Sequence, residues 1–378
     1  MDQIQRALQK QIETRMKPQK VMLVFGPRRV GKTFLLKQIV QSFSGKSLVL
    51  NGEDADSAAL LEPISIANYR HVLQNVELLA IDEAQHIPDI GRKLKLIVDE
   101  IPNIRVIASG SSSFDLKNQA GEPLVGRSTQ FTLLPFSQQE IATTESPIET
   151  KRNLEIRQLY GSYPDVVALE SFEEKKEYLM DIVESYLLKD ILAVDGIKNS
   201  AKIHDLLRLV AYQMGDELSY EEVGKQLGIS KNTVERYLDL LQKVFVLYRL
   251  GGYSKNLRKE VTKSSKWYFT DNGVRNAVIR NFEPLSRRTE IDRGALWENY
   301  IITERLKRNY NNRLLLDFYF WRTYDKQEID LLEVGSGVMN AFEMKAGKKT
   351  PTAPKAFAEA YPEACFSAVN ANNYTAFI

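Results

Sequence analysis

The fold of this chain is decided by the stretch Val21-Met-Leu-Val-Phe-Gly-Pro-Arg-Arg-Val-Gly-Lys-Thr33. An apolar run of strand length, Val21 to Phe25, leads into Gly-x-x-x-x-Gly-Lys-Thr, and an amphipathic segment follows from Phe34 to Val40. A strand, a glycine-rich loop and a helix in this order are the context that a P-loop requires. Backbone N–H groups of such a loop and the positive end of the helix bind phosphates. The stretch therefore predicts a nucleotide site, against the alternative of a strand-turn-helix that carries Gly-Lys-Thr by chance.

The residue types in this loop specify the expected ligands, which are ATP and Mg²⁺. The Lys32 ammonium would reach the β- and γ-phosphates, and the Thr33 hydroxyl would take one coordination position of Mg²⁺. The cofactor-binding residues are accordingly predicted to be Gly26, Pro27, Arg28, Arg29, Val30, Gly31, Lys32 and Thr33, with Asp82 further along the chain.

A second acidic motif supplies what hydrolysis needs. The apolar run Leu78-Leu-Ala-Ile81 ends in Asp82 and Glu83. Asp82 fits the acid that holds Mg²⁺, and Glu83 fits the base that orients and deprotonates the attacking water. Adjacent carboxylates at a strand end favour a nearby cation. The alternative is a solvated acidic turn.

Two further residues are candidates for the same site. Ser111 follows the strand-like run Ile104 to Ser109 and is placed to sense the γ-phosphate or the water, or it belongs to a serine-rich turn. Arg127 follows Gly126 and is either an arginine finger, acting in cis or from a neighbouring subunit, or a surface arginine. Together with Lys32 and Glu83, these two residues form the predicted catalytic set.

Length and composition limit the number of domains and the class of protein. The chain has 378 residues, enough for two or three domains, and its 43% hydrophobic and 26% charged residues are ordinary for a globular protein. A single cysteine, Cys365, and three histidines give no support for disulfides or a Cys/His zinc site. No apolar run approaches the roughly 20 residues that span a bilayer. We therefore expect a cytoplasmic protein without a membrane partner.

Strand-like and helical segments alternate in the first 150 residues, which predicts a parallel sheet covered on both faces. Residues 142–153 are polar and aperiodic, and they are expected to form a loop or linker. The predicted domains are 1–150, an ATPase domain; 151–280, a helical lid and winged helix; and 281–378, a C-terminal α/β domain.

The middle region contains a helix-turn-helix pattern. Ser219 is the expected N-cap of a helix that ends at Gly228, and a second helix begins at Lys231. Strands at 245–250 and 266–270 would add a wing. Residues 196–280 hold 15 Lys and Arg against 9 Asp and Glu, a net charge of +6, whereas the whole chain carries +2. The residues predicted to contact DNA are Lys255, Arg258, Lys259 and Lys263 in the wing and Lys231 and Arg236 on the second helix. Lys266 adds to the positive charge of the wing. A winged helix used only between domains or proteins is the alternative.

The last hundred residues contain a helical pattern, 293–306, and three strand-like runs, 314–321, 328–333 and 339–345. Asp330 and Glu343 are separated by a hairpin's length, and Glu343 and Lys345 point to one face of a strand. Two carboxylates on one Mg²⁺ and a lysine form a set that cleaves phosphodiesters. Glu298 is a candidate for an additional metal ligand, or for a group that contacts the ligands without touching the metal. Alternating Glu and Lys on a solvated strand is the alternative.

Taken in order, these motifs resemble a large family of bacterial and archaeal AAA-type ATPases. The matching segments are Gly26 to Thr33, Ile81 to Gln85, Pro88 to Ile90, Gly110 to Ser112, Gly126 to Arg127, Gly161 to Pro164, Lys266 to Gly273, Glu298 to Asn299, Glu328 to Asp330 and Glu343 to Lys345. The resemblance implies an ATPase core, a winged helix and a C-terminal domain similar to restriction endonucleases, of the PD-(D/E)xK type. Ser162 departs from the family's Gly-Gly-Tyr-Pro pattern, and the last domain ends soon after Val369.

Two functions remain open from the sequence. In the first, the protein is a DNA-associated ATPase that couples its nucleotide state to Mg²⁺-dependent DNA binding or cleavage by the last domain. In the second, it is a nucleotide-dependent switch or scaffold whose last domain binds nucleic acid or protein without cutting. An assembly into a homo-oligomer is compatible with both.

Overall fold

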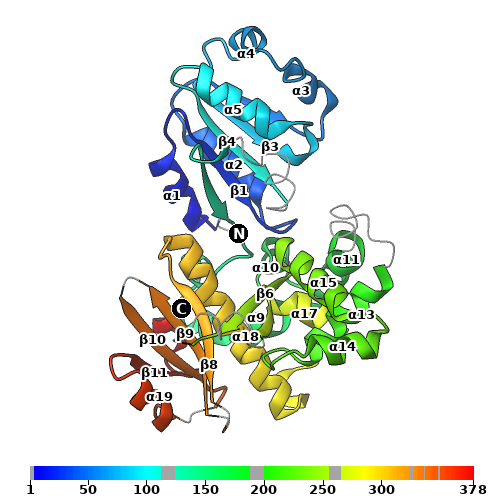
Figure 1. Cartoon of the computed structure of the whole chain (residues 1–378), viewed down its shortest axis with the longest axis vertical. Coiled ribbons are helices and arrows are strands. Elements are labelled where there is room, and N and C mark those ends of the chain that lie inside the picture. The colour runs from blue at the N-terminus through cyan, green and yellow to red at the C-terminus, as the bar shows by residue number, and fades with distance from the viewer. Residues whose placement is uncertain are drawn as a thin grey trace.

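We describe the fold from a computed structural model. It describes residues 4–111, 124–187, 200–254, 265–323, 325, 327–335, 337–347 and 350–378. The N-terminal α/β part forms one half of the molecule, and a helical region and a second sheet form the other half, as Figure 1 shows. In the described residues, none of the helices has the length and apolarity to cross a membrane.

The first sheet has five parallel strands in the order β2-β3-β4-β1-β5. The strands are β1 (Val21–Phe25), β2 (Ser47–Asn51), β3 (Leu78–Asp82), β4 (Arg105–Gly110) and β5 (Ser128–Thr132). The helices around them are α1 (Ala7–Arg15), α2 (Lys32–Ser42), α3 (Ala55–Leu60), α4 (Ile66–Val72), α5 (Ile90–Glu100) and α7 (Gln138–Ile141), with a 3₁₀ turn η1 (Ala84–His86) after β3. Because the strands are parallel, all their carboxyl ends meet at one edge.

Both faces of this sheet are buried at its central strands β1, β3 and β4, as the alternation of strands and helices predicts. Met22 and Val24 of β1 pack in one core with Leu8 and other residues of α1 and α2. Val21, Leu23 and Phe25 point the other way and pack in a second core with α4 and α5. Burial on both faces explains why β1 is an uninterrupted apolar run.

The middle of the chain consists of helices with one β-hairpin between α15 and α17. Its helices are α8 (Pro147–Arg152), α9 (Leu154–Tyr160), α10 (Pro164–Ala168), α11 (Phe172–Asp181), a π-helical turn η3 (Ile182–Leu187), α13 (Ser200–Tyr212), α14 (Tyr220–Leu227), α15 (Lys231–Lys243), α17 (Asn272–Val278) and a 3₁₀ turn η4 (Leu285–Arg287). The hairpin consists of β6 (Leu247–Gly252) and β7 (Ser265–Phe269). The helix-turn-helix pair and its N-cap are confirmed, since the Ser219 side chain accepts from the Glu222 N–H.

The second sheet joins the hairpin to the C-terminal strands. Its order is β11-β10-β9-β8-β6-β7, with β8 (Asp317–Arg322), β9 (Glu328–Gly335), β10 (Val338–Met344) and β11 (Cys365–Val369). The parallel pairing of β6 with β8 brings Gly251 beside Tyr319. The sheet therefore runs across the predicted domain boundary at 280/281, and the hairpin expected to be a separate wing is part of the C-terminal sheet.

One long helix, α18 (Glu290–Asn312), links the two halves of the molecule. The Glu304 carboxylate on this helix accepts a hydrogen bond of 2.6 Å from the Gln138 N–H, and the Lys307 ammonium donates to the Phe136 carbonyl at 3.0 Å. The remaining helices, α19 (Lys355–Ala360) and α20 (Tyr374–Phe377), flank β11. The C-terminal element order is thus α-β-β-β-α-β-α, from α18 to α20.

Two local expectations from the sequence are wrong. Residues 147–152 form α8 instead of a linker, because Ser146 and Glu149 cap the helix reciprocally and Pro147 occupies its first turn. Lys266, counted above with the basic wing, lies within β7 and is only 4% exposed. Its positive charge is turned into the protein and not toward a nucleic acid.

Candidate functional site

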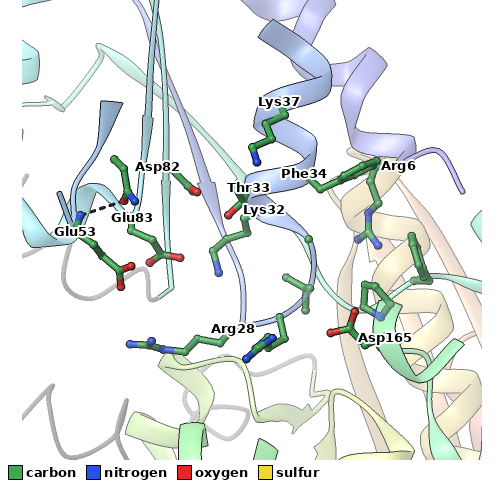
Figure 2. A pocket seen from close by; sticks show the side chains of 16 residues that line it. Arg6, Arg28, Lys32, Thr33, Phe34, Lys37, Glu53, Asp82, Glu83 and Asp165 are labelled. Carbon is green, nitrogen blue, oxygen red and sulfur yellow. Dashed lines mark hydrogen bonds between the residues drawn. The ribbon is translucent and has the colours of Figure 1, made fainter. Parts of the chain in front are cut away.

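A cavity of about 660 Å³ lies at the carboxyl edge of the first sheet. It is lined by Arg28, Arg29, Val30, Gly31, Lys32, Thr33, Phe34 and Lys37 from the P-loop and α2, by Asn51, Glu53, Asp82 and Glu83 from β2, β3 and the segments after them, and by Arg6, Phe136, Pro164 and Asp165. Figure 2 shows Asp82 and Glu83 on one side of Lys32 and Thr33, and Arg6 and Asp165 on the other. The structure thus brings together the P-loop and the acidic pair that the sequence predicts.

The loop between β1 and α2 is shaped by its glycines. A Cβ atom on Gly26 would stand 2.0 Å from the Leu133 carbonyl oxygen, so no other residue fits there without a shift of the backbone. Gly31 has φ +90°, in the left-handed region that favours glycine. The Lys32 ammonium donates to the carbonyls of Gly26 and Pro27 at 3.0 Å each. It is therefore held against the loop itself, whereas the adjacent Thr33 is exposed to the cavity.

The acidic pair at the end of β3 is fixed by a buried serine that the sequence analysis missed. Ser109 of β4 donates to the Asp82 carboxylate, and its hydroxyl oxygen accepts from the Glu83 N–H at 3.2 Å. Glu83 itself has φ 47°, a left-handed conformation that is rare outside glycine and that often marks functional positions. Because β3 and β4 are neighbours, a polar residue at the end of β4 was the available signal.

Ser111 reaches the acidic pair through a glutamine. The Gln85 side chain donates to the Glu83 carboxylate at 2.5 Å and to the Ser111 hydroxyl at 3.4 Å. Ser111 is 7% exposed and is not among the residues that line the cavity. Its contact with Glu83 is thus indirect, so a role as a sensor of the γ-phosphate or the attacking water stays a prediction.

Arg127 lies away from these residues. It directly precedes β5, whose first residue, Ser128, pairs with the first residue of β1, Val21, so Arg127 sits at the amino edge of the sheet. Its side chain pairs with Asp99 at 2.6 Å. The structure therefore does not bring Arg127 to the P-loop of its own chain, which leaves the surface role and the role in a neighbouring subunit.

The far wall of the cavity combines the start of α10 with Arg6 and Phe136 from the N-terminal part of the chain. Pro164 and Asp165 begin α10, and the preceding Ser162 donates its N–H to the Asp271 carboxylate at 2.8 Å. Arg6 is fully buried beside them, with an ion pair of 3.4 Å to Glu140, and desolvation lowers its pKa despite that carboxylate. These residues come from three segments that are distant in sequence, so no local pattern indicated them.

A second cluster of charged residues lies on the C-terminal sheet. Asp330 of β9 and Glu343 of β10 are on neighbouring antiparallel strands, and the Glu343 carboxylate pairs with the Lys345 ammonium at 2.6 Å. The Met344 N–H donates to Asp330 at 2.6 Å. Burial, followed by the negative charge of Glu343, raises the pKa of Asp330 to about 6, although Lys266 opposes the shift. The structure thus brings the predicted carboxylate pair and lysine together.

Lys266 and Glu328 complete this cluster and were not predicted as site residues. The Lys266 ammonium pairs with Glu328 and lies 3.8 Å from Glu298, the carboxylate on α18 that the sequence singled out. Burial raises the pKa of Glu298 to about 7, against the opposing charge of Lys266. Burial alone would lower the pKa of Lys266, but the surrounding carboxylates raise it above its usual value.

The cluster offers one position suited to a cation. The Glu343 Oε2 atom is buried and has no hydrogen-bond partner among the described residues, while Oε1 of the same side chain is paired with Lys345. A buried carboxylate oxygen without a donor is costly unless a cation is bound. Within the described part of the chain, however, no three His, Cys, Asp or Glu side chains form a group that could hold a metal. In this geometry Glu298 does not form such a group with Asp330 and Glu343, so its role as a ligand or as a group beside the ligands stays a prediction.

The predicted DNA contacts are described only in part. Lys231 and Arg236 are exposed on α15, as predicted. Lys255, Arg258, Lys259 and Lys263 lie outside the described residues. The predictions for these six residues therefore stay predictions.

Comparison with known protein families identifies the nucleotide-binding part. Residues 18–142 match the family described as an AAA domain. Residues 18–142 form an AAA-type P-loop domain. The AAA domain contains the five-stranded sheet, the P-loop and the acidic pair. Residues 151–285 and 293–374 match two other families, each described as a domain of unknown function.

Relatives of the whole chain come from bacteria and archaea. An uncharacterized protein of Mycobacterium tuberculosis is 27% identical over 327 residues, which cover 86% of this chain and 70% of the relative. An uncharacterized protein of Methanocaldococcus jannaschii is 23% identical over 349 residues, with coverages of 87% and 76%. The similarity thus extends beyond the AAA domain into the second half of the chain.

Two solved structures show a weak likeness to parts of this chain. The Holliday junction branch migration motor RuvB of Thermotoga maritima has 16% sequence identity and a TM-score of 0.30, and the match covers 64% of this chain and 85% of that chain. A katanin structure has 15% identity and a TM-score of 0.26, with coverages of 39% and 51%.

Proposed function

We propose that this protein is an ATP-hydrolysing, DNA-associated ATPase whose nucleotide state is coupled to Mg²⁺-dependent DNA binding or cleavage by its C-terminal carboxylate cluster. The observation that carries the ATPase part is the lining of one cavity by Lys32, Thr33, Asp82 and Glu83. A volume of about 660 Å³ is in the range of small-molecule sites.

Each residue has a definite task in this proposal. Lys32 would bind the β- and γ-phosphates, and Thr33 and Asp82 would hold Mg²⁺, which supplies positive charge to neutralise the phosphates. Glu83 accepts the proton of the attacking water. Ser109 keeps both carboxylates in place, because it bonds to the side chain of one and the backbone of the other.

The DNA part of the proposal is supported by the chemistry of the C-terminal cluster. Asp330 and the unpartnered oxygen of Glu343 are the groups that would hold Mg²⁺, which supplies an activated water and neutralises phosphate charge. Lys345 is close enough to Glu343 to orient that water or take up its proton. The exposed basic residues Lys231 and Arg236 on α15 are proposed to contact DNA phosphates.

Nucleotide binding is tested by calorimetric titration with a non-hydrolysable ATP analogue and Mg²⁺. The wild-type chain should bind one equivalent, and Lys32→Ala should weaken binding at least tenfold, whereas Asp330→Ala should bind like the wild type. Equal affinity of the Lys32→Ala chain and the wild type would refute the assignment of the cavity.

Cleavage is tested with plasmid, linear and single-stranded DNA, with Mg²⁺ or Mn²⁺, in the presence and absence of ATP. Cleavage that disappears in Asp330→Ala would support the carboxylate cluster as the cutting site. An uncut substrate in every condition would favour the second candidate, a nucleotide-dependent switch whose last domain binds without cutting. One observation favours that candidate. Among the described residues, Glu298 does not form a group of three carboxylates with Asp330 and Glu343 that could hold a metal.

A further inference from the structure

The side chain of Lys266 extends from the middle of the chain into the C-terminal cluster. It is 4% exposed, pairs with Glu328, approaches Glu298 to 3.8 Å, and lies 5.4 Å from the centre of the Phe320 ring. An ammonium group so fully removed from water is stable only with compensating charges, and two carboxylates supply them.

Glu298 and Glu328 are thereby engaged by a residue of the protein. Glu298 accepts a further hydrogen bond of 2.5 Å from the Tyr268 hydroxyl, which comes from the same strand as Lys266. Asp330 and Glu343 receive their contacts from the other side of the cluster, from the Met344 N–H and the Lys345 ammonium. The four carboxylates thus form two pairs. Glu298 and Glu328 surround the Lys266 ammonium, whereas Asp330 and Glu343 include the buried oxygen that has no hydrogen-bond partner among the described residues.

Carboxylate sites that act on phosphodiesters often use two divalent cations about 4 Å apart. We propose that the Lys266 ammonium occupies the position of a second cation, so that this cluster takes one divalent ion, at Asp330 and Glu343, and not two. The inference rests on the proposed function of the cluster and assigns Lys266 as a positioning residue. It explains why Glu298 lies near the predicted ligands without joining them.

The inference is tested by counting bound ions. Mn²⁺ is titrated into the nucleotide-free full chain and followed by calorimetry and by electron paramagnetic resonance of the free ion. All proteins carry Asp82→Asn, which removes a ligand of the P-loop site. The parent should bind one Mn²⁺, and adding Asp330→Ala should abolish that binding.

Changes at Lys266 then decide the role of the ammonium. Lys266→Met frees Glu298 and Glu328 and should raise the stoichiometry to two ions, whereas Lys266→Arg should keep it at one. The triple change Lys266→Met, Glu298→Gln and Glu328→Gln should also return it to one. The single change Glu298→Gln, which leaves Glu328 to compensate the charge of Lys266, should keep the stoichiometry at one and the affinity within about threefold of the parent.

The outcomes separate the two proposals. Absence of Mn²⁺ binding in the parent would overturn the metal site itself and the inference with it. Two ions in the parent would overturn the inference alone. A stoichiometry of one in Lys266→Met, with an unchanged circular dichroism spectrum, would also overturn it. Where Lys266→Met does not fold, a loss of binding in the Glu298→Gln chain, with an unchanged circular dichroism spectrum, would overturn it.

Discussion

The Asp271 carboxylate accepts a hydrogen bond of 2.8 Å from the backbone N–H of Ser162. Ser162 leads into α10, which lines the nucleotide cavity, and Asp271 follows β7, the strand that carries Lys266. The two segments are in close contact, since a Cβ atom on Gly161 would lie 1.9 Å from Asp271 Oδ1. This contact therefore joins the segment that lines the cavity to the segment that follows the strand of Lys266.

Replacement of Asp271 should therefore destabilise the chain. Its carboxylate also caps α17 by accepting from the N–H groups of Gly273 and Val274. Loss of a cap costs about 1 kcal/mol, and a buried N–H left without a partner costs about 1–3 kcal/mol more. We expect Asp271→Ala to lower the free energy of unfolding in urea by about 2–4 kcal/mol. Asp271→Asn keeps one oxygen for the cap but loses the acceptor for the Ser162 N–H, so it should lose less stability than Asp271→Ala. Wild-type stability in Asp271→Asn would argue against the Ser162 contact.

Ser109→Ala should impair hydrolysis more than binding. The serine hydroxyl joins the Asp82 side chain to the Glu83 backbone, and groups that orient metal ligands typically contribute 10- to 100-fold. We expect ATP turnover to fall about tenfold, with nucleotide affinity changed less than threefold. Ser111→Ala is the matched control. Its ATP turnover should fall less, because Ser111 contacts Glu83 only through the side chain of Gln85. A wild-type rate in Ser109→Ala would contradict the assignment.

Arg127→Ala should leave ATP turnover within about twofold of the wild type. The Arg127 guanidinium is at the edge of the sheet opposite the P-loop and is paired with the partly exposed Asp99. Asp99→Ala should behave alike, since exposed ion pairs of this kind contribute little. Turnover should be measured over a range of protein concentrations. A large loss that grows with concentration would instead show that Arg127 acts on a neighbouring subunit.

The buried Asp330 makes stability depend on pH in a defined direction. Burial and Glu343 raise its pKa in the folded state to about 6, above the usual value of 3.8, so the folded chain binds more protons between these values. Stability from this group is present at low pH and is lost as pH rises through about 6. Asp330→Asn should therefore gain stability relative to the wild type at pH 8, by about 1–3 kcal/mol, and much less at pH 5. Urea unfolding in the presence of a chelator measures the stability of both chains at each pH. A greater stability of Asp330→Asn at pH 5 but not at pH 8 would contradict this account.

Local patterns in the sequence were sufficient for part of this structure. The apolar run from Val21 to Phe25 and the Gly-Lys-Thr that follows fix a strand, a phosphate loop and a helix through nearby residues alone. The acidic pair Asp82 and Glu83 needed only one more assumption, that parallel strands end at a common edge.

Other features depend on contacts between distant segments. The pairing of Gly251 with Tyr319 merges the hairpin with the C-terminal sheet, and it turns Lys266 from an expected surface charge into a buried partner of Glu328. Neither the spacing nor the composition around Lys266 shows which strand will lie beside it. The cap of Ser146 by Glu149, in contrast, was visible in the sequence as a Ser-Pro-x-Glu pattern and was overlooked.

The most direct test of the central claim is the rate of phosphate release from ATP in Mg²⁺ by the purified chain and by Glu83→Gln. We predict turnover by the wild type and at least a 100-fold loss in Glu83→Gln, with ATP affinity preserved, because only the group that accepts the proton of the water is changed. Wild-type turnover in Glu83→Gln, or a wild-type chain that binds ATP without releasing phosphate, would contradict the claim that this site hydrolyses ATP.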